Sequence, residues 1–169
     1  MRTMMRNVTA IGLISDTHGL LREEAVRALK GSELIIHAGD VGNPEIIETL
    51  KAIAPVIAVR GNVDTEAWAS ALSETEVVET GAATIFVLHD AHALDLNPAA
   101  AGFHIVVSGH SHKPSRTEHD GVLYINPGSA GPRRFQLPVT IARLNLAQTP
   151  WKVEFIDLSG VGSTLSPPE

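Results

Sequence analysis

The sequence predicts an α/β protein in which two mixed sheets pack as a sandwich flanked by helices. Strand-like and helix-like segments alternate over residues 8–59, and strand-like segments dominate residues 77–158. The 169 residues are 44% apolar, which is enough for one compact core. We therefore expect one domain over residues 1–158. Residues 159–169, with Gly160, Pro167 and Pro168, have the composition of a flexible C-terminal tail.

The first half of the chain has the βαβαβ order that is typical of a parallel sheet. Apolar runs predict strands at residues 8–14, 34–37 and 56–59. Helical spacing of apolar residues predicts a helix over residues 22–30. A second helix is expected over residues 44–54, with Asn43 as its N-cap and Pro44 at its first position, and Pro55 ends it.

The second half of the chain is predicted to consist mainly of strands. The expected strands cover residues 77–79, 84–88, 105–108, 116–119, 122–126, 139–146 and 151–158. The pair Asp120-Gly121 is a typical two-residue hairpin turn between two of them. We expect the last two strands to pair antiparallel, and residues 98–101 to form a short helix.

Composition limits the classes of partner. The formal net charge is −6 and Lys and Arg do not occur in runs, so we expect neither a nucleic-acid duplex nor an anionic membrane as the partner. The absence of cysteine excludes disulfides and thiol catalysis. No apolar stretch reaches the roughly 18 residues of a membrane helix, and the first residues do not have the pattern of a secretory signal. We therefore expect a cytoplasmic protein.

Five of the predicted strands end in side chains that bind metal ions. These seven candidate ligands are Asp16, His18, Asp40, Asn62, His89, His110 and His112. Carboxylate, amide and imidazole groups hold hard or borderline divalent ions without thiolate. Because ligands gather at the carboxyl ends of strands in open sheets, these residues are expected to converge on one site.

The set is large enough for two ions that share a carboxylate, as in two-metal hydrolases with ions about 3.5–4 Å apart. Asp40 is the natural bridge, since it stands in the middle of the set. Two divalent ions less two carboxylates leave a surplus of about +2, which suits a hydroxide and a phosphodiester monoanion. Glycines at positions 39, 61 and 109 directly precede ligands, where a missing Cβ allows close approach of the backbone.

The ordered motifs resemble those of the calcineurin-like metallophosphoesterases, in particular their small bacterial and archaeal phosphodiesterase branch. The motifs are Asp16-Thr17-His18-Gly19, Gly39-Asp40-Val41, Gly61-Asn62-Val63-Asp64, His89, Gly109-His110-Ser111-His112 and Asn126-Pro127-Gly128-Ser129. They cover residues 16–129 in the family's order. The resemblance implies the two-sheet metallophosphoesterase fold.

The resemblance also implies hydrolysis of phosphodiesters at a binuclear site, with a metal-bridging water or hydroxide as nucleophile. One ion would be held by Asp16, His18, Asp40 and His112, and the other by Asp40, Asn62, His89 and His110. Within this set we assign the catalytic role to Asp16, Asp40, Asn62 and His110. The two divalent ions would be manganese, with iron, zinc or nickel as alternatives. We expect a small phosphoester substrate and, since relatives often self-associate, a homodimer.

The sequence departs from the family pattern in two places. Val63 stands where larger members carry a histidine that is proposed to protonate the leaving group. The segment His89-Asp90-Ala91-His92 replaces the usual His-Gly-His or His-Gly-Asp. Asp90 would narrow the range of substrates or His92 would act as a displaced general acid; a solvated loop variation is the alternative.

Other polar residues have less specific explanations. His37 is expected to be a packed or supporting histidine, and His104 and His119 to lie at the surface. Arg60 would either steer phosphate or make a structural ion pair, and Arg133-Arg134 is expected to be solvated. Residues 126–129 are expected to form a turn beside the cleft.

Two rival functions remain open at this level. A phosphomonoesterase would use the same ligands, and the fold's use in the retromer coat allows a non-catalytic interaction scaffold. A scaffold need not keep its ligands, whereas all seven positions are intact here.

Overall fold

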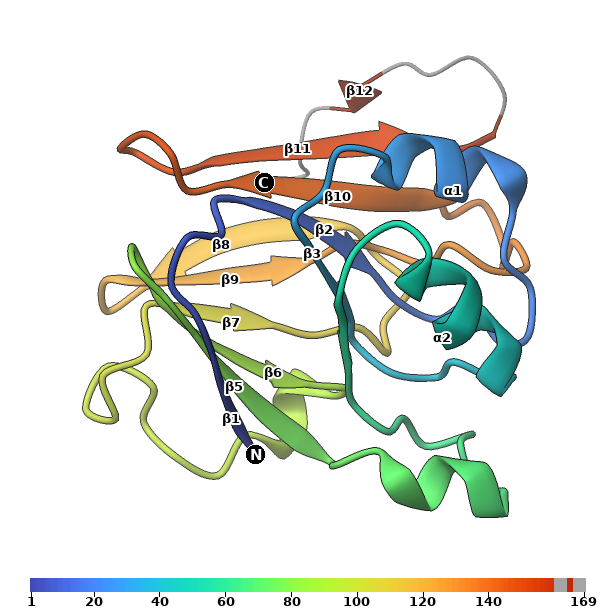
Figure 1. Cartoon of the computed structure of the whole chain (residues 1–169), viewed down its shortest axis with the longest axis horizontal. Helices are drawn as coiled ribbons and strands as arrows, with labels where there is room; N and C mark the ends of the chain where they lie inside the picture. Colours follow the sequence, from blue (N-terminus) through green and yellow to red (C-terminus); the bar gives the residue numbers. More distant parts are fainter. Residues whose placement is uncertain (160–163, 166–169) are drawn as a thin grey trace.

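The computed structural model describes residues 1–159 and 164–165, which form a sandwich of two mixed six-stranded sheets (Figure 1). One sheet has the order β1-β5-β6-β7-β9-β8, and the other has the order β12-β11-β10-β2-β3-β4. The strands are β1 (Arg2–Met5), β2 (Ala10–Ile14), β3 (Leu34–His37), β4 (Val56–Ala58), β5 (Thr75–Thr80), β6 (Thr84–Leu88), β7 (Ile105–Val107), β8 (Ser115–His119), β9 (Val122–Asn126), β10 (Thr140–Asn145), β11 (Lys152–Asp157) and β12 (Thr164–Leu165). The expected two-sheet α/β sandwich is confirmed.

The predicted βαβαβ unit forms the parallel part of one sheet. Strand β2 pairs parallel with β3, and β3 pairs parallel with β4. The crossovers are the helices α1 (Glu23–Leu29) and α2 (Pro44–Lys51), which lie on the same side of the molecule in Figure 1. Asn43 caps α2 as expected, since its side chain accepts the N–H of Glu45 at 2.9 Å.

Alternation along the strands divides their side chains between separate apolar clusters. Leu13 and Leu34 face inward, against Ile85 and Val107 of the opposite sheet. Their neighbours on the other faces, such as Ile14, pack beneath the helices. The outer face of the sheet of β6 and β7 is covered in part by a third cluster of Phe86, Leu88, Phe103, Val106 and Val122. Both sheets are thus packed on apolar clusters up to the strand ends from which the loops begin.

The hairpins match their predictions. Strand β8 pairs antiparallel with β9 with His119 opposite Val122, and Asp120 and Gly121 both have positive φ, as a type I′ turn requires. Strands β10 and β11 pair antiparallel over six residues each. In the expected tail, Thr164–Leu165 pairs with β11 as β12, while residues 160–163 and 166–169 lie outside the described residues.

The short helix predicted at residues 98–101 is wrong. The N–H groups of Ala101, Gly102 and Phe103 bond to the carbonyls of Asn97, Ala99 and Pro98, so the bonds span four, three and five residues. No helical repeat arises from such spacing. Gly102, at φ +83°, then turns the chain away. The segment is a series of turns.

Besides β12, three elements of the described residues were not predicted. Strand β1 pairs parallel with β5 at the edge of its sheet. The 3₁₀ helices η1 (Ala67–Ala71) and η2 (Ala91–Ala93) lie between strands. None of the helices in the described ranges is long and apolar enough to cross a membrane.

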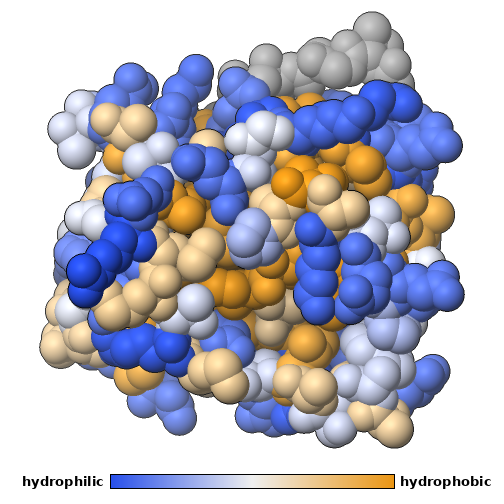
Figure 2. Space-filling view, in the orientation of Figure 1, coloured by the Kyte–Doolittle hydropathy of each residue, from blue (hydrophilic) through white to orange (hydrophobic). Residues whose placement is uncertain are grey.

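Large apolar side chains reach the surface at separate positions rather than in one segment. Met4, Leu20, Val63, Leu96 and Phe135 are all exposed. On the face shown in Figure 2, apolar surface lies toward the centre and hydrophilic side chains lie mostly around it.

Candidate metal centre

The loops after β2 and β3 are tied together along their backbones. The N–H groups of Asp16, His18 and Gly19 donate to the carbonyls of Gly39, Asp40 and Val41 at 2.9–3.0 Å. This ladder continues the parallel pairing of β2 and β3 beyond the ends of the strands. It places the Asp16, His18 and Asp40 side chains next to one another at the carboxyl edge of the sheet, as expected.

The loop after β4 is fixed to the loop after β3 by one buried carboxylate. Asp64 Oδ2 accepts the N–H groups of Val41 and Gly61 at 3.1 and 2.9 Å, and its Oδ1 accepts that of Gly42 at 2.9 Å. Asp40 Oδ1 in turn accepts the N–H of Val63 at 3.0 Å. These bonds fix the position of Asn62 relative to Asp40. In the sequence, Asp64 stands out only as the last residue of the Gly61-Asn62-Val63-Asp64 motif, and nothing there indicates this role.

The opposite sheet contributes His89 after β6, and His110 and His112 after β7. His110 N–H donates to Asp16 Oδ2 at 3.1 Å, so the two sheets are joined at the site. Asn126 Nδ2 donates to the carbonyl of Gly109 at 2.9 Å and to Ser111 Oγ at 3.0 Å, which holds the loop that carries both histidines. The turn at residues 126–129 therefore supports the site, a role that its turn signal alone does not reveal.

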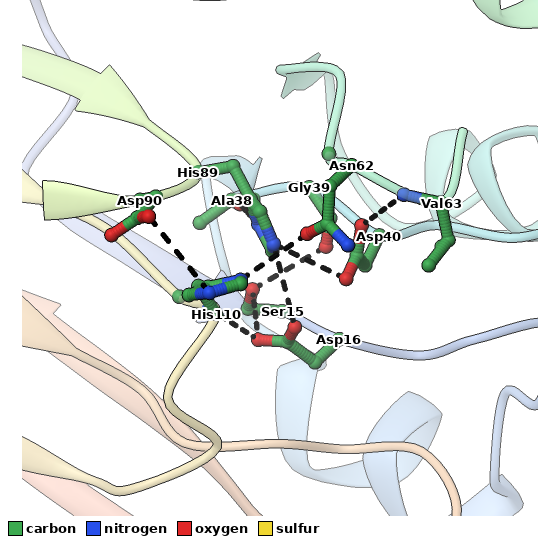
Figure 3. A network of polar contacts seen from close by, with 12 residues as sticks. Ser15, Asp16, Ala38, Gly39, Asp40, Asn62, Val63, His89, Asp90 and His110 are labelled. Atoms are coloured by element: carbon green, nitrogen blue, oxygen red, sulfur yellow. Dashed lines mark hydrogen bonds and ion pairs between the residues drawn. The ribbon is translucent and has the colours of Figure 1, made fainter. Parts of the chain in front are cut away.

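The seven predicted ligands form two adjacent groups. One contains Asp16, His18 and His112, and the other contains Asp40, His89 and His110; within each group the ligand atoms lie within 4.8 Å of one another. Asn62 joins the second group, with its Oδ1 3.2 Å from His110 Nδ1. Figure 3 shows Asp40, Asn62, His89 and His110 pointing toward one another above Asp16. The structure thus brings all seven residues together.

Most of the candidate ligands have an unfavourable backbone conformation. Asp16, His18, Asp40, His110 and His112 all have φ between +47° and +71°. In the described residues, only Asp120 and Phe135 share this conformation among non-glycine residues. Left-handed backbone costs about 1–3 kcal/mol per residue and gathers at functional sites. Its concentration on five of seven candidates indicates that the loops are shaped to direct these side chains.

The glycines before the ligands are required by the packing of other ligands. A Cβ at Gly39 would lie 2.7 Å from His89 Nδ1, and one at Gly109 would overlap Ser15 Oγ and lie 2.6 Å from Asp16 Oδ2. A Cβ at Gly61 would overlap Asp40. Close approach of the backbone was expected from the sequence. The structure shows that the groups approached are neighbouring ligand side chains and, at Gly109, also the hydroxyl of Ser15, which donates to Asp16.

The geometry leaves space for a cation beside Asp16. Its Oδ1 is buried and makes no hydrogen bond, yet the Nε2 atoms of His112, His18 and His89 lie 3.4, 3.7 and 3.8 Å from it. Donor atoms bound to one ion at about 2.0–2.2 Å are about 3–3.5 Å apart. An unpaired buried carboxylate oxygen is costly. The arrangement therefore fits a divalent cation among these atoms.

Charge favours cation binding at the second group as well. Burial opposes ionisation of Asp40, but contacts with His89 and the Val63 N–H outweigh it and lower the pKa of this carboxyl. His89 Nε2 lies 3.2 Å from Asp40 Oδ2, within ion-pair distance although without hydrogen-bond geometry. Burial alone would lower the pKa of His89, but Asp40 and the Ala38 carbonyl raise it. A bound metal would replace this proton.

Supporting residues set the tautomers of two histidines. His89 Nδ1 lies 2.7 Å from the carbonyl of Ala38, to which it can only donate, so Nε2 is directed into the site. His37 is buried, as expected, and neither of its ring nitrogens faces the metal centre. Its Nε2 contacts Thr17 Oγ1 at 2.9 Å, and its Nδ1 accepts the Gly39 N–H at 3.2 Å. Burial lowers the pKa of His37 to about 4. His37 is therefore a neutral support for both ligand loops.

The remaining polar residues singled out in the sequence lie at the surface as expected or make a structural ion pair. His104 and His119 are exposed, and so is the Arg133-Arg134 pair. Arg60 makes an ion pair with Glu74 at 3.0 Å, although it also lines a cavity next to Asn62.

Paired aspartate and histidine clusters at the carboxyl ends of strands in an α/β sandwich define the metallohydrolase class of site. The chain belongs to the calcineurin-like phosphoesterase superfamily, whose domain pattern matches residues 10–149. The resemblance inferred from the motifs is thereby confirmed.

Relatives agree with this assignment. The chain is 33% identical over 147 residues to a probable metallophosphoesterase of Methanothermobacter thermautotrophicus, covering 80% of this chain and 86% of that protein. It is 30% identical over 136 residues to a phosphodiesterase of Methanocaldococcus jannaschii, covering 70% and 82%. The structure of vacuolar protein sorting 29 from Cryptosporidium parvum has the same fold, with a TM-score of 0.78, 23% identity and coverage of 94% and 95%.

Proposed function

We propose that this protein is a metal-dependent phosphodiesterase with two divalent ions in one site. The observation that carries the proposal is the pair of adjacent ligand groups, built from both sheets, around a buried carboxylate oxygen without a hydrogen-bond partner. The similarity to the phosphodiesterase of Methanocaldococcus jannaschii supports the choice of a diester.

Asp16, His18, Asp40 and His112 would hold one ion, and Asp40, Asn62, His89 and His110 the other. When bound, the two ions would polarise the phosphoryl oxygens and lower the pKa of water, so that it can attack phosphorus. Manganese suits this mixed set of oxygen and nitrogen ligands, as do iron, zinc and nickel.

The protein's own contribution is to hold these groups before a substrate arrives. Hydrogen bonds to Ala38, Val63 and Ser15 fix the side chains of His89, Asp40 and Asp16. Preorganised groups of this kind need little rearrangement during the reaction. A small phosphoester is the proposed substrate class, because the cavities around the site have volumes of about 410 and 470 Å³.

The proposal is tested by metal analysis together with hydrolysis of bis-(p-nitrophenyl) phosphate and p-nitrophenyl phosphate. With manganese, the diester should be cleaved with the higher kcat/KM. Asp40→Ala should bind at least one ion fewer and lose more than about 100-fold in kcat/KM, since even supporting residues of metal sites are worth about 10–100-fold. Glu48→Gln, on the exposed side of α2, is the control and should match the natural protein.

Three results would contradict the proposal. Faster cleavage of the monoester would indicate a phosphomonoesterase. No turnover with manganese, iron, zinc or nickel would favour an interaction scaffold. Full metal content in Asp40→Ala would exclude Asp40 as the shared ligand.

A further inference from the structure

Asp90 places a carboxylate at the edge of the metal centre. It follows the candidate ligand His89 directly and begins η2, where its Oδ1 accepts the N–H of His92 at 2.9 Å. Its Oδ2 lies 3.8 Å from Nε2 of the candidate ligand His110. Figure 3 shows the two side chains facing each other across this edge. The carboxylate is thus held in place by the backbone on one side and directed at the site on the other.

Asp90 and His110 stand between two cavities. Both residues line a cavity of about 470 Å³ together with Ser115, Thr117 and Tyr124 of β8 and β9. Both also line a second cavity of about 410 Å³, together with Arg60 and Asn62. A phosphate at the metal centre therefore has two separate spaces beside it. A phosphodiester has two ester substituents to place, and a monoester has one.

The charge of Asp90 favours a phosphodiester over a phosphomonoester, as the two cavities do. A phosphodiester carries one negative charge at neutral pH, whereas a phosphomonoester carries nearly two. A carboxylate at this edge of the metal centre would repel the second charge of a monoester bound there, and the repulsion is only partly screened because the Asp90 side chain is 35% exposed. A neutral residue at this position would lack that repulsion.

We propose that Asp90 makes this site selective for phosphodiesters by repelling dianionic monoesters. The inference rests on the proposed function and adds its specificity-determining residue. Selectivity of this kind arises from disfavouring the wrong substrate as well as from binding the right one. In this scheme, Asp90 neither binds metal nor transfers a proton.

The test compares the natural protein with Asp90→Asn and Asp90→Ser, each loaded with manganese. Both replacements remove the charge and keep an oxygen that can accept the His92 N–H. The ratio of kcat/KM for bis-(p-nitrophenyl) phosphate to that for p-nitrophenyl phosphate should fall about tenfold, mainly because the monoester reacts faster. One unit charge a few ångströms away at a partly screened site has an effect of this order. Competitive inhibition by inorganic phosphate at pH 8, where it is mainly a dianion, should tighten by a similar factor.

Asp120→Asn is the matched control. It removes the same charge from the β8–β9 turn, and Asp120 lines neither of the two cavities. Its substrate ratio and phosphate inhibition should equal those of the natural protein. Metal content should be unchanged in all three variants.

The inference is overturned if the natural protein cleaves the diester and both Asp90 variants keep its substrate ratio and phosphate inhibition. It is also overturned if both variants lose metal or lose activity toward the two substrates equally, because Asp90 would then only position His110. Failure of the proposed function looks different, since the natural protein itself would then cleave no diester.

Discussion

At the scale of single residues, the candidate ligands combine unfavourable backbone with strong local hydrogen bonding. Asp16 and Asp40 have φ of 55° each, a conformation that aspartate tolerates better than most residues. Their carboxylates accept hydrogen bonds from His110 N–H and Val63 N–H. These bonds stabilise the loops and point the second oxygen of each carboxylate at the histidines. The local conformation is thus explained by the direction that each side chain must take.

His37 should make the protein sensitive to acid. Its pKa falls from about 6.5 in the unfolded chain to about 4, since burial disfavours the charged ring and Nδ1 already accepts the Gly39 N–H. The unfolded state then binds more protons between these values, so this contribution to stability is complete above pH 6.5 and is lost as the pH falls toward 4. By pH 5 the free energy of unfolding should drop by about 2 kcal/mol relative to pH 7 on this account.

Urea unfolding at pH 7 and pH 5, with a chelator present in both, measures this effect. In His37→Gln the drop between the two pH values should be smaller than in the natural protein by about 2 kcal/mol, because glutamine does not titrate. Equal drops in the two proteins would show that His37 is not the titrating group.

At the scale of elements, the ends of β2, β3 and β4 act as one unit because hydrogen bonds join their loops. The shared carboxylate is Asp64, which accepts three backbone N–H groups from the loops after β3 and β4. A carboxylate is suited to this role since both of its oxygens are acceptors only. The position of Asp40 and of Asn62 therefore depends on a residue that belongs to neither ligand group.

Asp64→Asn should weaken both the fold and metal binding. The amide NH₂ would face at least one backbone N–H, which leaves a buried donor without a partner and costs about 1–3 kcal/mol. Affinity for manganese should fall about 10–100-fold, the usual effect of losing a support of a metal ligand. Thermal unfolding and calorimetric titration with manganese measure the two effects. Glu48→Gln, at an exposed position on α2, should change neither. Unaltered affinity in Asp64→Asn would rule out the positioning role.

At the scale of the whole molecule, the site joins the two sheets of the sandwich. Residues after β2, β3 and β4 come from one sheet, and residues after β6 and β7 come from the other. A cation bound by both sets would link the layers, and it would bind the folded chain in preference to the unfolded one. Metal binding and global stability should therefore be coupled.

Manganese should raise the Tm and a chelator should lower it again. At 100 times Kd, one ion adds about 2.7 kcal/mol to the free energy of unfolding, which corresponds to about 5–10 °C for a chain of this size. Scanning calorimetry with and without manganese measures the shift. Asp40→Ala should show a smaller shift, since the proposed shared ligand is missing. A Tm that does not respond to manganese or chelator would contradict a site that spans both sheets.

Prediction from the sequence succeeded where one strong local signal was present. It failed where a segment's structure depends on the strand or loop that it pairs with. Asn43-Pro44 marks the start of α2 and Asp120-Gly121 forms the hairpin turn, because each requires only local backbone geometry. Strand β1 has little apolar pattern and exists because β5 offers it an edge. The segment at 98–101 has helix-forming alanines, but the bonds of its backbone follow no helical repeat.

The sequence by itself predicted the βαβαβ order and the seven candidate ligands, because periodicity and the residue types at strand ends are local properties. The strand-rich second half of the chain predicted the sandwich. Only the tertiary structure decided which loops meet, and hence the supporting roles of Asp64 and Asn126 and the position of Asp90 beside His110. Their side chains reach residues up to 23 positions away in the chain. Such contacts depend on how the sheets and loops pack, and a sequence motif does not predict that packing.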